Sequence, residues 1–128
     1  MSTSVKRMIE AADAVVPRIT PEAAQQLIAD SGALVVDVRD AAEVARDGKV
    51  AGAINISRGM LEFRADPSSA SHDSQFRQDR PLIVYCASGG RSALAGKVLK
   101  ELGFDQVYNL GGFQGWVEAG GAVDQPTG

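Results

Sequence analysis

The chain has 128 residues, of which 45% are hydrophobic and 23% charged, and its formal net charge is −3 at pH 7. This length suffices for one α/β domain with its own core but not for two comfortable ones. The acidic balance argues against a general nucleic-acid binder, which would normally carry a basic excess. No apolar run approaches the length of a membrane-spanning helix, so an integral membrane protein is not expected.

Residues 1–17 are predicted to form an amphipathic helical extension rather than a signal peptide. Apolar side chains recur at helical spacing over residues 5–16, which indicates a helix that docks on another part of the protein. Glu10 and Asp13 interrupt the continuous apolar segment that a signal peptide requires. A cytoplasmic location follows as the default prediction, and residues 18–128 are left to form the main domain.

Four short runs rich in apolar and β-branched residues predict the strands of a sheet. The strongest run opens with proline and is continuously apolar, as a central parallel strand tends to be. This run covers residues 81–85. The other three runs are residues 34–38, 53–56 and 106–110.

Helical segments are predicted between these strands. Thr20 and Pro21 supply an N-cap and a proline at the first helical position for the first segment. The clearest segment covers residues 92–102, which place apolar side chains on one face and are followed by Gly103. The remaining segments are residues 40–47 and a brief turn at 112–119. Strands that alternate with helices predict an α/β fold, with a mostly parallel sheet covered by helices on both faces.

Residues 66–80 differ from the rest of the chain because they are polar and rich in serine. They are predicted to form a long surface connection. His72 is the only histidine and lies in this segment, where we expect it to be exposed to solvent rather than catalytic. A papain-like mechanism, which needs a Cys-His pair, is therefore not expected.

Cys86 is the only cysteine, which excludes an intramolecular disulfide and a zinc site built on several thiolates. It lies where the strongest predicted strand meets the clearest predicted helix, the edge at which open α/β sheets bind ligands. The residues after it are small and include two glycines, so the chain can curl and turn its N–H groups inward. The helix N-terminus and Arg91 add positive charge, and the loop therefore favours an anion.

The position of Cys86 indicates a reactive thiol. A thiol near a helix N-terminus and a cation has a lowered pKa and is more often a thiolate at neutral pH. Such a thiolate can attack an electrophilic atom carried by an anion, which suits the removal of sulfur from thiosulfate or of phosphate from an ester. The competing interpretation is a tight strand-to-helix turn around an inert buried thiol.

The sequence resembles the rhodanese family closely over roughly residues 19–120. Ordered blocks along the chain carry the resemblance, and together they are much more specific than one short motif. The blocks are residues 86–92, residues 36–39 with Glu43, residues 52–56, residues 58–63, residues 102–104, and residues 107–113 with Trp116. The resemblance implies one rhodanese-like α/β domain, with a central, mostly parallel sheet of about five strands flanked by helices.

The resemblance also implies a sulfurtransferase. A donor such as thiosulfate would leave a persulfide on Cys86, and a thiol or cyanide would then remove the sulfur. Arg58 either helps to attract the anionic donor or is a solvated surface arginine. The loop residues expected to bind the donor are Ala87, Ser88, Gly89, Gly90, Arg91 and Ser92.

No metal or organic cofactor is expected, and neither is a nucleic-acid or membrane partner. The partners implied are a small sulfur-containing anion as donor and a thiol or cyanide as acceptor. The amphipathic helix at the N-terminus could cap the monomer or join two copies, so the sequence leaves a homodimer open.

Two other functions stay open. The loop from Cys86 through Arg91 has six residues, whereas related phosphatases of the same fold have a loop one residue longer and a wider cradle. The loop also lacks an obvious acid to protonate a leaving alkoxide, so sulfur transfer is favoured over phosphate transfer. The other alternative is a module that binds anions or a partner without turnover, although modules that have lost activity commonly lack the cysteine.

Three positions depart from the family pattern, and the mildest is Ser57, which stands before Arg58 where proline is common. Lys49 and Ala51 stand where relatives usually carry His and Pro. We expect this difference to affect the rigidity of the loop more than the chemistry. Activity would be reduced if the histidine of the relatives tunes the active site.

Some further polar and glycine positions receive structural interpretations. Asp37 and Arg39 follow a buried strand, and we expect them to pin its end by hydrogen bonds. Gly111 and Gly112 are expected to form no more than a tight turn.

Overall fold

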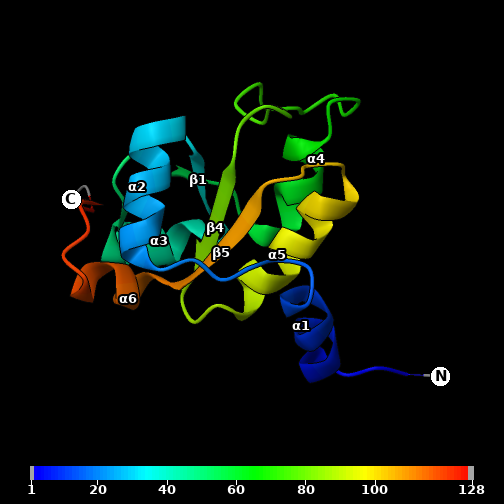
Figure 1. The fold of residues 1–128 in the computed structure, drawn as a ribbon, viewed down its shortest axis with the longest axis horizontal. Coiled ribbons are helices and arrows are strands. Elements are labelled where there is room, and N and C mark those ends of the chain that lie inside the picture. Colours follow the sequence, from blue (N-terminus) through cyan, green and yellow to red (C-terminus); the bar gives the residue numbers. More distant parts are fainter. Residues whose placement is uncertain (1, 127–128) are drawn as a thin grey trace.

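A computed structural model describes residues 2–126, and the predicted segments 1–17 and 18–128 reach beyond this range by Met1 and by residues 127–128. The fold is a sheet between two layers of helices (Figure 1). Its four strands are parallel, in the order β3 (Ile54–Asn55), β1 (Leu34–Asp37), β4 (Leu82–Cys86) and β5 (Val107–Gly112). The predicted α/β fold is confirmed, with four strands in the central sheet of the described residues where about five were expected.

Two more strands form a separate pair. These are β2 (Lys49–Val50) and β6 (Val123–Asp124), which run antiparallel to each other. Neither strand was predicted from the sequence, because a run of two residues is too short to show an alternation of apolar and polar side chains.

Side chains of the central strand β4 enter two hydrophobic clusters. Leu82, Val84 and Cys86 pack in the cluster that includes residues of α4 (Leu61–Ala65) and α5 (Gly90–Glu101). Ile83 and Tyr85 pack in the cluster on the opposite face of the sheet, which includes residues of α2 (Pro21–Ser31) and α6 (Phe113–Glu118). Successive side chains of a strand point to opposite faces, so a strand covered on both sides is apolar at every position. Figure 1 shows α4 and α5 on one side of the sheet and α2 and α6 on the other.

The predicted helices are present, with shifted ends. In α2 the Thr20 hydroxyl accepts a hydrogen bond from the Ala23 N–H at 3.1 Å, as an N-cap does. The segment predicted at 40–47 is α3 (Ala41–Asp47). Helix α5 begins at Gly90, two residues before the predicted start, so Arg91 and Ser92 lie in its first turn.

The segment between β3 and β4 contains more structure than expected. A short 3₁₀ helix, η1 (Arg58–Met60), leads into α4. Residues 66–80 form a series of turns, as predicted, but they are not entirely on the surface. Phe76 is 3% exposed and packs with its ring 6.1 Å from that of Phe104. Burial of this ring anchors the connection to the core.

The N-terminal helix α1 (Val5–Asp13) packs on α5. It ends three residues before the predicted end at Val16, and Val16 itself is buried in the core. The apolar face is only partly covered, because Val5 is 65% and Met8 44% exposed. The division into an extension and a main domain stays a prediction. No helix within residues 2–126 is long and apolar enough to cross a membrane.

Candidate active site

Cys86 is the last residue of β4 and lies at the carboxyl edge of the sheet. The alternation along β4 turns its side chain toward α5, and it is 0% exposed. Ala87 and Ser88, which follow it directly, are exposed. The chain therefore passes from the buried core to the surface between Cys86 and the next residue.

The backbone of the loop turns back onto the sulfur at Gly89. This residue has φ of +100°, a conformation that glycine adopts without the steric cost that a Cβ would add. Its N–H donates to Cys86 Sγ at 3.0 Å, and the Ser92 N–H approaches the same sulfur at 3.4 Å. The curled loop predicted from the small residues is confirmed, and N–H groups of the loop and of the first turn of α5 point at Sγ.

Two opposing effects act on the pKa of Cys86. Burial raises the pKa, because a thiolate is poorly solvated in the core. Hydrogen bonds from the Ser92 hydroxyl and from the N–H groups of Ser92, Gly89 and Ser88 lower it. The second effect prevails, so the pKa of Cys86 lies below its ordinary value and ionisation of the thiol is easier than in a free cysteine.

Asn109 is a buried residue of this site that the sequence analysis treated only as part of a strand. The register pairs Asn109 of β5 with Val84 of β4 and thereby places it on the α5 face. Its Oδ1 accepts from the Ser92 hydroxyl at 2.7 Å and from the Gly111 N–H at 2.9 Å. A polar residue within an otherwise apolar strand was the signal that could have identified it.

Gly112 does more than the tight turn expected of it. A Cβ at Gly112 would lie 2.6 Å from the carbonyl oxygen of Ala87. The glycine therefore leaves the space through which the cysteine loop passes.

Arg91 lies close to the loop, but its charge is paired. Its guanidinium donates to both carboxylate oxygens of Glu43 on α3, at 2.8 and 2.9 Å. Hydrogen bonds from Arg91 and from the Asp40 N–H hold the pKa of Glu43 at about 2. Arg91 thus ties α3 to the first turn of α5.

A second cation, Arg18, lies beside the loop and was not singled out from the sequence. A Cβ at Gly89 would lie 3.7 Å from Arg18 Nη1, and the guanidinium packs against Gly111. Arg18 itself is exposed. It reaches the carboxyl edge of the sheet because residues 17–19 hydrogen bond to Asn109 of β5.

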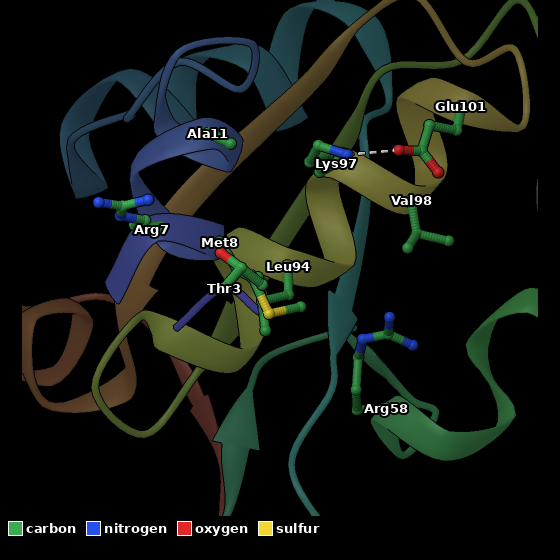
Figure 2. Close-up of a pocket in the computed structure, with 9 residues that line it drawn as sticks. All are labelled: Thr3, Arg7, Met8, Ala11, Arg58, Leu94, Lys97, Val98 and Glu101. Carbon is green, nitrogen blue, oxygen red and sulfur yellow. Dashed lines mark hydrogen bonds and ion pairs between the residues drawn. The ribbon is translucent and has the colours of Figure 1, made fainter. Parts of the chain in front are cut away.

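Arg58 lines a groove of about 320 Å³ between α1 and α5. Figure 2 shows Met8 of α1 and Leu94 and Val98 of α5 in this groove, with Arg58 reaching it from η1. The groove is lined by no residue of the cysteine loop, and the Arg58 guanidinium donates to Glu62 at 2.9 Å. Its predicted contact with an anionic donor stays a prediction.

The hydrogen bonds expected of Asp37 and Arg39 at the end of β1 are present. The two residues are 0% and 1% exposed and form an ion pair of 2.6 Å between Oδ2 and Nη2. His72 differs from its expected exposure, because it is half-buried and its Nε2 has no hydrogen-bond partner within residues 2–126. Within residues 2–126, the Cys86 sulfur hydrogen bonds to Gly89 and Ser92 and not to the His72 ring.

Two of the departures from the family pattern lie at the β2–β6 pair, Lys49 within β2 and Ala51 directly after it. Lys49 Nζ lies 2.8 Å from Asp124 Oδ2, and the Ala51 N–H donates to the carbonyl of Ala122 at 2.9 Å. A proline at position 51 could not donate this bond. The C-terminal segment therefore holds this loop in place, in part through a backbone hydrogen bond that a proline at position 51 would remove.

The rhodanese-like domain family matches residues 20–119 of the chain. The chain belongs to the rhodanese family. The resemblance read from the sequence is confirmed over nearly the same residues. The thiosulfate sulfurtransferase GlpE of Actinobacillus succinogenes is 35% identical to this chain over 104 residues, or 80% of this chain and 85% of that protein.

Solved structures agree with this membership. A protein of unknown function from Rhodopseudomonas palustris, described as a possible tyrosine phosphatase, matches this chain with a TM-score of 0.88 and 37% identity, covering 97% of this chain and 96% of that one. The polysulfide-sulfur transferase homodimer of Wolinella succinogenes matches with a TM-score of 0.74 and 32% identity, covering 93% of this chain and 85% of that one.

Proposed function

We propose that the protein is a sulfurtransferase that carries sulfur as a persulfide on Cys86, from a donor such as thiosulfate to a thiol or cyanide. The observation that carries the proposal is the set of donors aimed at Sγ, with the Gly89 N–H at 3.0 Å. These donors stabilise a thiolate at the start of the loop. Sulfurtransferase relatives such as GlpE support the same conclusion.

The reaction proceeds in two displacements. The Cys86 thiolate attacks the outer sulfur of thiosulfate, a new S–S bond forms, and sulfite leaves with the electron pair of the bond that breaks. The acceptor then attacks the outer sulfur of the persulfide, and the Cys86 thiolate is regenerated. The donors that stabilise the first thiolate also stabilise it as the leaving group of the second step.

Phosphate transfer is the second candidate, because the R. palustris relative is described as a possible tyrosine phosphatase. A phosphate dianion is bound best by charge-assisted hydrogen bonds from a guanidinium. In this chain the Arg91 guanidinium is engaged by Glu43 through two hydrogen bonds. The six-residue loop from Cys86 through Arg91 is also the shorter, sulfurtransferase form. Sulfur transfer is therefore the better supported function.

The remaining assignments extend this proposal. The residues assigned to the donor are the loop 87–92, chiefly through its N–H groups, with Arg58 as a more distant cation. A homodimer like that of the W. succinogenes relative is proposed as the alternative to a monomer. The cytoplasm is the proposed location.

The deciding experiment is the intact mass of the reduced protein, measured before and after thiosulfate and again after cyanide. We expect a gain of one sulfur atom that cyanide removes, and no gain in Cys86→Ser, whose side chain is nearly isosteric. Sulfur transfer by Cys86→Ser would overturn the assignment of the nucleophile. A reactive thiol that gains no sulfur would favour the binding module, and hydrolysis of an aryl phosphate by the same sample would favour the phosphatase.

A further inference from the structure

Three buried side chains from three elements meet at the carboxyl edge of the sheet. Cys86 ends β4, Ser92 lies in the first turn of α5, and Asn109 lies in β5, each 0% exposed. The Ser92 hydroxyl lies between the other two groups, 2.7 Å from Asn109 Oδ1 and 3.4 Å from Cys86 Sγ. It therefore links the sulfur to the amide oxygen, while the amide nitrogen of Asn109 donates to the Gly89 carbonyl at 3.3 Å.

The Ser92 hydroxyl has one proton and several acceptors within reach. Asn109 Oδ1 is the nearest acceptor at 2.7 Å, followed by the Gly89 carbonyl at 3.1 Å and Cys86 Sγ at 3.4 Å. While Cys86 is a thiol, its S–H can donate to Ser92 Oγ as the Ser92 proton points to Asn109. Once Cys86 is a thiolate, the sulfur can only accept, and the same hydroxyl proton is needed there.

We propose that Asn109 is a positioning residue for Cys86, whose amide oxygen holds the Ser92 hydroxyl proton in the thiol state and yields it to the sulfur when Cys86 ionises. The thiol proton leaves to solvent, and the Ser92 proton turns from Oδ1 to Sγ without leaving its oxygen. Oδ1 keeps the Gly111 N–H as a donor at 2.9 Å. This inference rests on the proposed role of Cys86 as the nucleophile.

The Ser92 hydroxyl and the Asn109 amide act on Cys86 as uncharged groups. The charged groups near the loop are Arg91, which is paired with Glu43, and Arg18 beside Gly89 and Gly111. The Asp37–Arg39 ion pair lies beside Tyr85, on the opposite face of the sheet from Cys86. Asn109 competes for the Ser92 proton as a neutral amide, so it adds no charge that would oppose a thiolate.

The test measures how much Ser92→Ala raises the pKa of Cys86 in three backgrounds that differ in the acceptor at position 109. With Asn109→Leu the competing acceptor is gone, so we expect Ser92→Ala to raise the pKa by about 1, a tenfold loss of thiolate at a fixed pH. With Asn109 we expect about half that rise, and with Asn109→Asp, a stronger acceptor, almost none. The pKa is read from the rate of iodoacetamide alkylation against pH.

A purely structural role predicts the opposite order. If Asn109 only holds the loop in place, Asn109→Leu would displace Ser92, and Ser92→Ala would then raise the pKa less than it does beside Asn109. That result would overturn the proposal. Should Asn109→Leu prevent folding, judged by thermal unfolding, Asn109→Asp decides, because a purely structural role predicts that Ser92→Ala raises the pKa of Cys86 as much in that background as beside Asn109. Should Asn109→Asp prevent folding, Asn109→Leu decides as described.

A control variant and an independent readout complete the experiment. Tyr108→Phe changes the neighbouring residue of β5 and should leave the pKa of Cys86 unaltered. Alkylation requires no sulfur donor, so the pKa series reports on Asn109 even if persulfide formation fails. The mass experiment, in turn, tests the proposed function whatever the order of the pKa series.

Discussion

Tyr85 and Cys86 are consecutive residues at the end of β4, and each belongs to a buried polar network on its own face of the sheet. The network at Tyr85 is ionic: the Asp37 carboxylate accepts from the Tyr85 hydroxyl and from Arg39, both at 2.6 Å. The network at Cys86 consists of a thiol, the Ser92 hydroxyl, the Asn109 amide and backbone N–H groups.

In the ionic network, every polar group is paired with another group of the protein. Arg39 also donates to the Gly48 carbonyl at 2.7 Å and lies 4.6 Å from the centre of the Phe113 ring. Burial and the adjacent Asp37 carboxylate raise the pKa of Tyr85 above its ordinary value, so its hydroxyl stays protonated and donates. The Tyr85 oxygen in turn accepts from the Val50 N–H at 2.9 Å. Each group has a fixed partner, and the network holds residues 48–50 against the sheet.

The network at Cys86 converges on one atom whose charge can change. The groups that hydrogen bond to the sulfur are neutral, so the balance between burial and hydrogen bonding is the main influence on the pKa of Cys86. Matched charges in the core thus hold a structure in place, and neutral donors around a titratable sulfur adjust its reactivity. Variants in each network should separate stability from thiol reactivity.

The largest expected effect is on the ionic side. Asp37→Asn leaves the Arg39 guanidinium buried without its counter-ion, which should lower the free energy of unfolding by about 3–5 kcal/mol. The measurement is urea unfolding at neutral pH. Alkylation of Cys86 in the folded variant should keep the pH profile of the parent. A loss below about 1 kcal/mol would show that the buried charge pair is dispensable.

An intermediate effect is expected at Gly89. Gly89→Ala places a Cβ on a residue with φ of +100°, which should cost about 1–2 kcal/mol of stability and move the N–H away from the sulfur. The pKa of Cys86 should therefore rise, as measured by iodoacetamide alkylation. Gly52→Ala is the matched control, because Gly52 has φ of +80° and open space around it. Its stability should fall similarly while the pKa stays unchanged, and equal pKa values in both variants would contradict the role of Gly89.

The smallest effect is expected at the ion pair of Glu43 and Arg91, which lies beside the cysteine loop. The pKa of Glu43 is about 2 in the folded protein, below its ordinary value of 4.5. The carboxylate therefore stabilises the fold fully above about pH 4.5, and this contribution is lost as the pH falls toward 2. Glu43→Gln should lower the free energy of unfolding by about 1 kcal/mol at pH 7.

Unfolding of the parent and Glu43→Gln at several pH values tests this dependence. The difference between the two proteins should shrink as the medium becomes more acidic, because the parent then loses its carboxylate charge. A difference that stays constant from neutral to acidic pH would assign the loss to packing rather than to the ion pair.

The fold was predictable where the sequence signal is local. The apolar run before Cys86 and the N-cap at Thr20 identified β4 and α2, because strand burial and helix capping depend on residues next to each other in the chain. The strands β2 and β6 were missed, because each has two residues and forms only through pairing with a segment distant in sequence. The early start of α5 at Gly90 depends on the conformation of Gly89, which no pattern of apolar residues records.

By itself the sequence determined that Cys86 lies at a strand-to-helix junction, in a loop of small residues, within a family of known fold. Only the tertiary structure decided which side chains act on it. Arg91 is paired with Glu43, 48 residues away, and Ser92 with Asn109, 17 residues away. The physical reason is that backbone propensity and periodicity are local properties, whereas the partner of a polar side chain depends on which elements packing brings together.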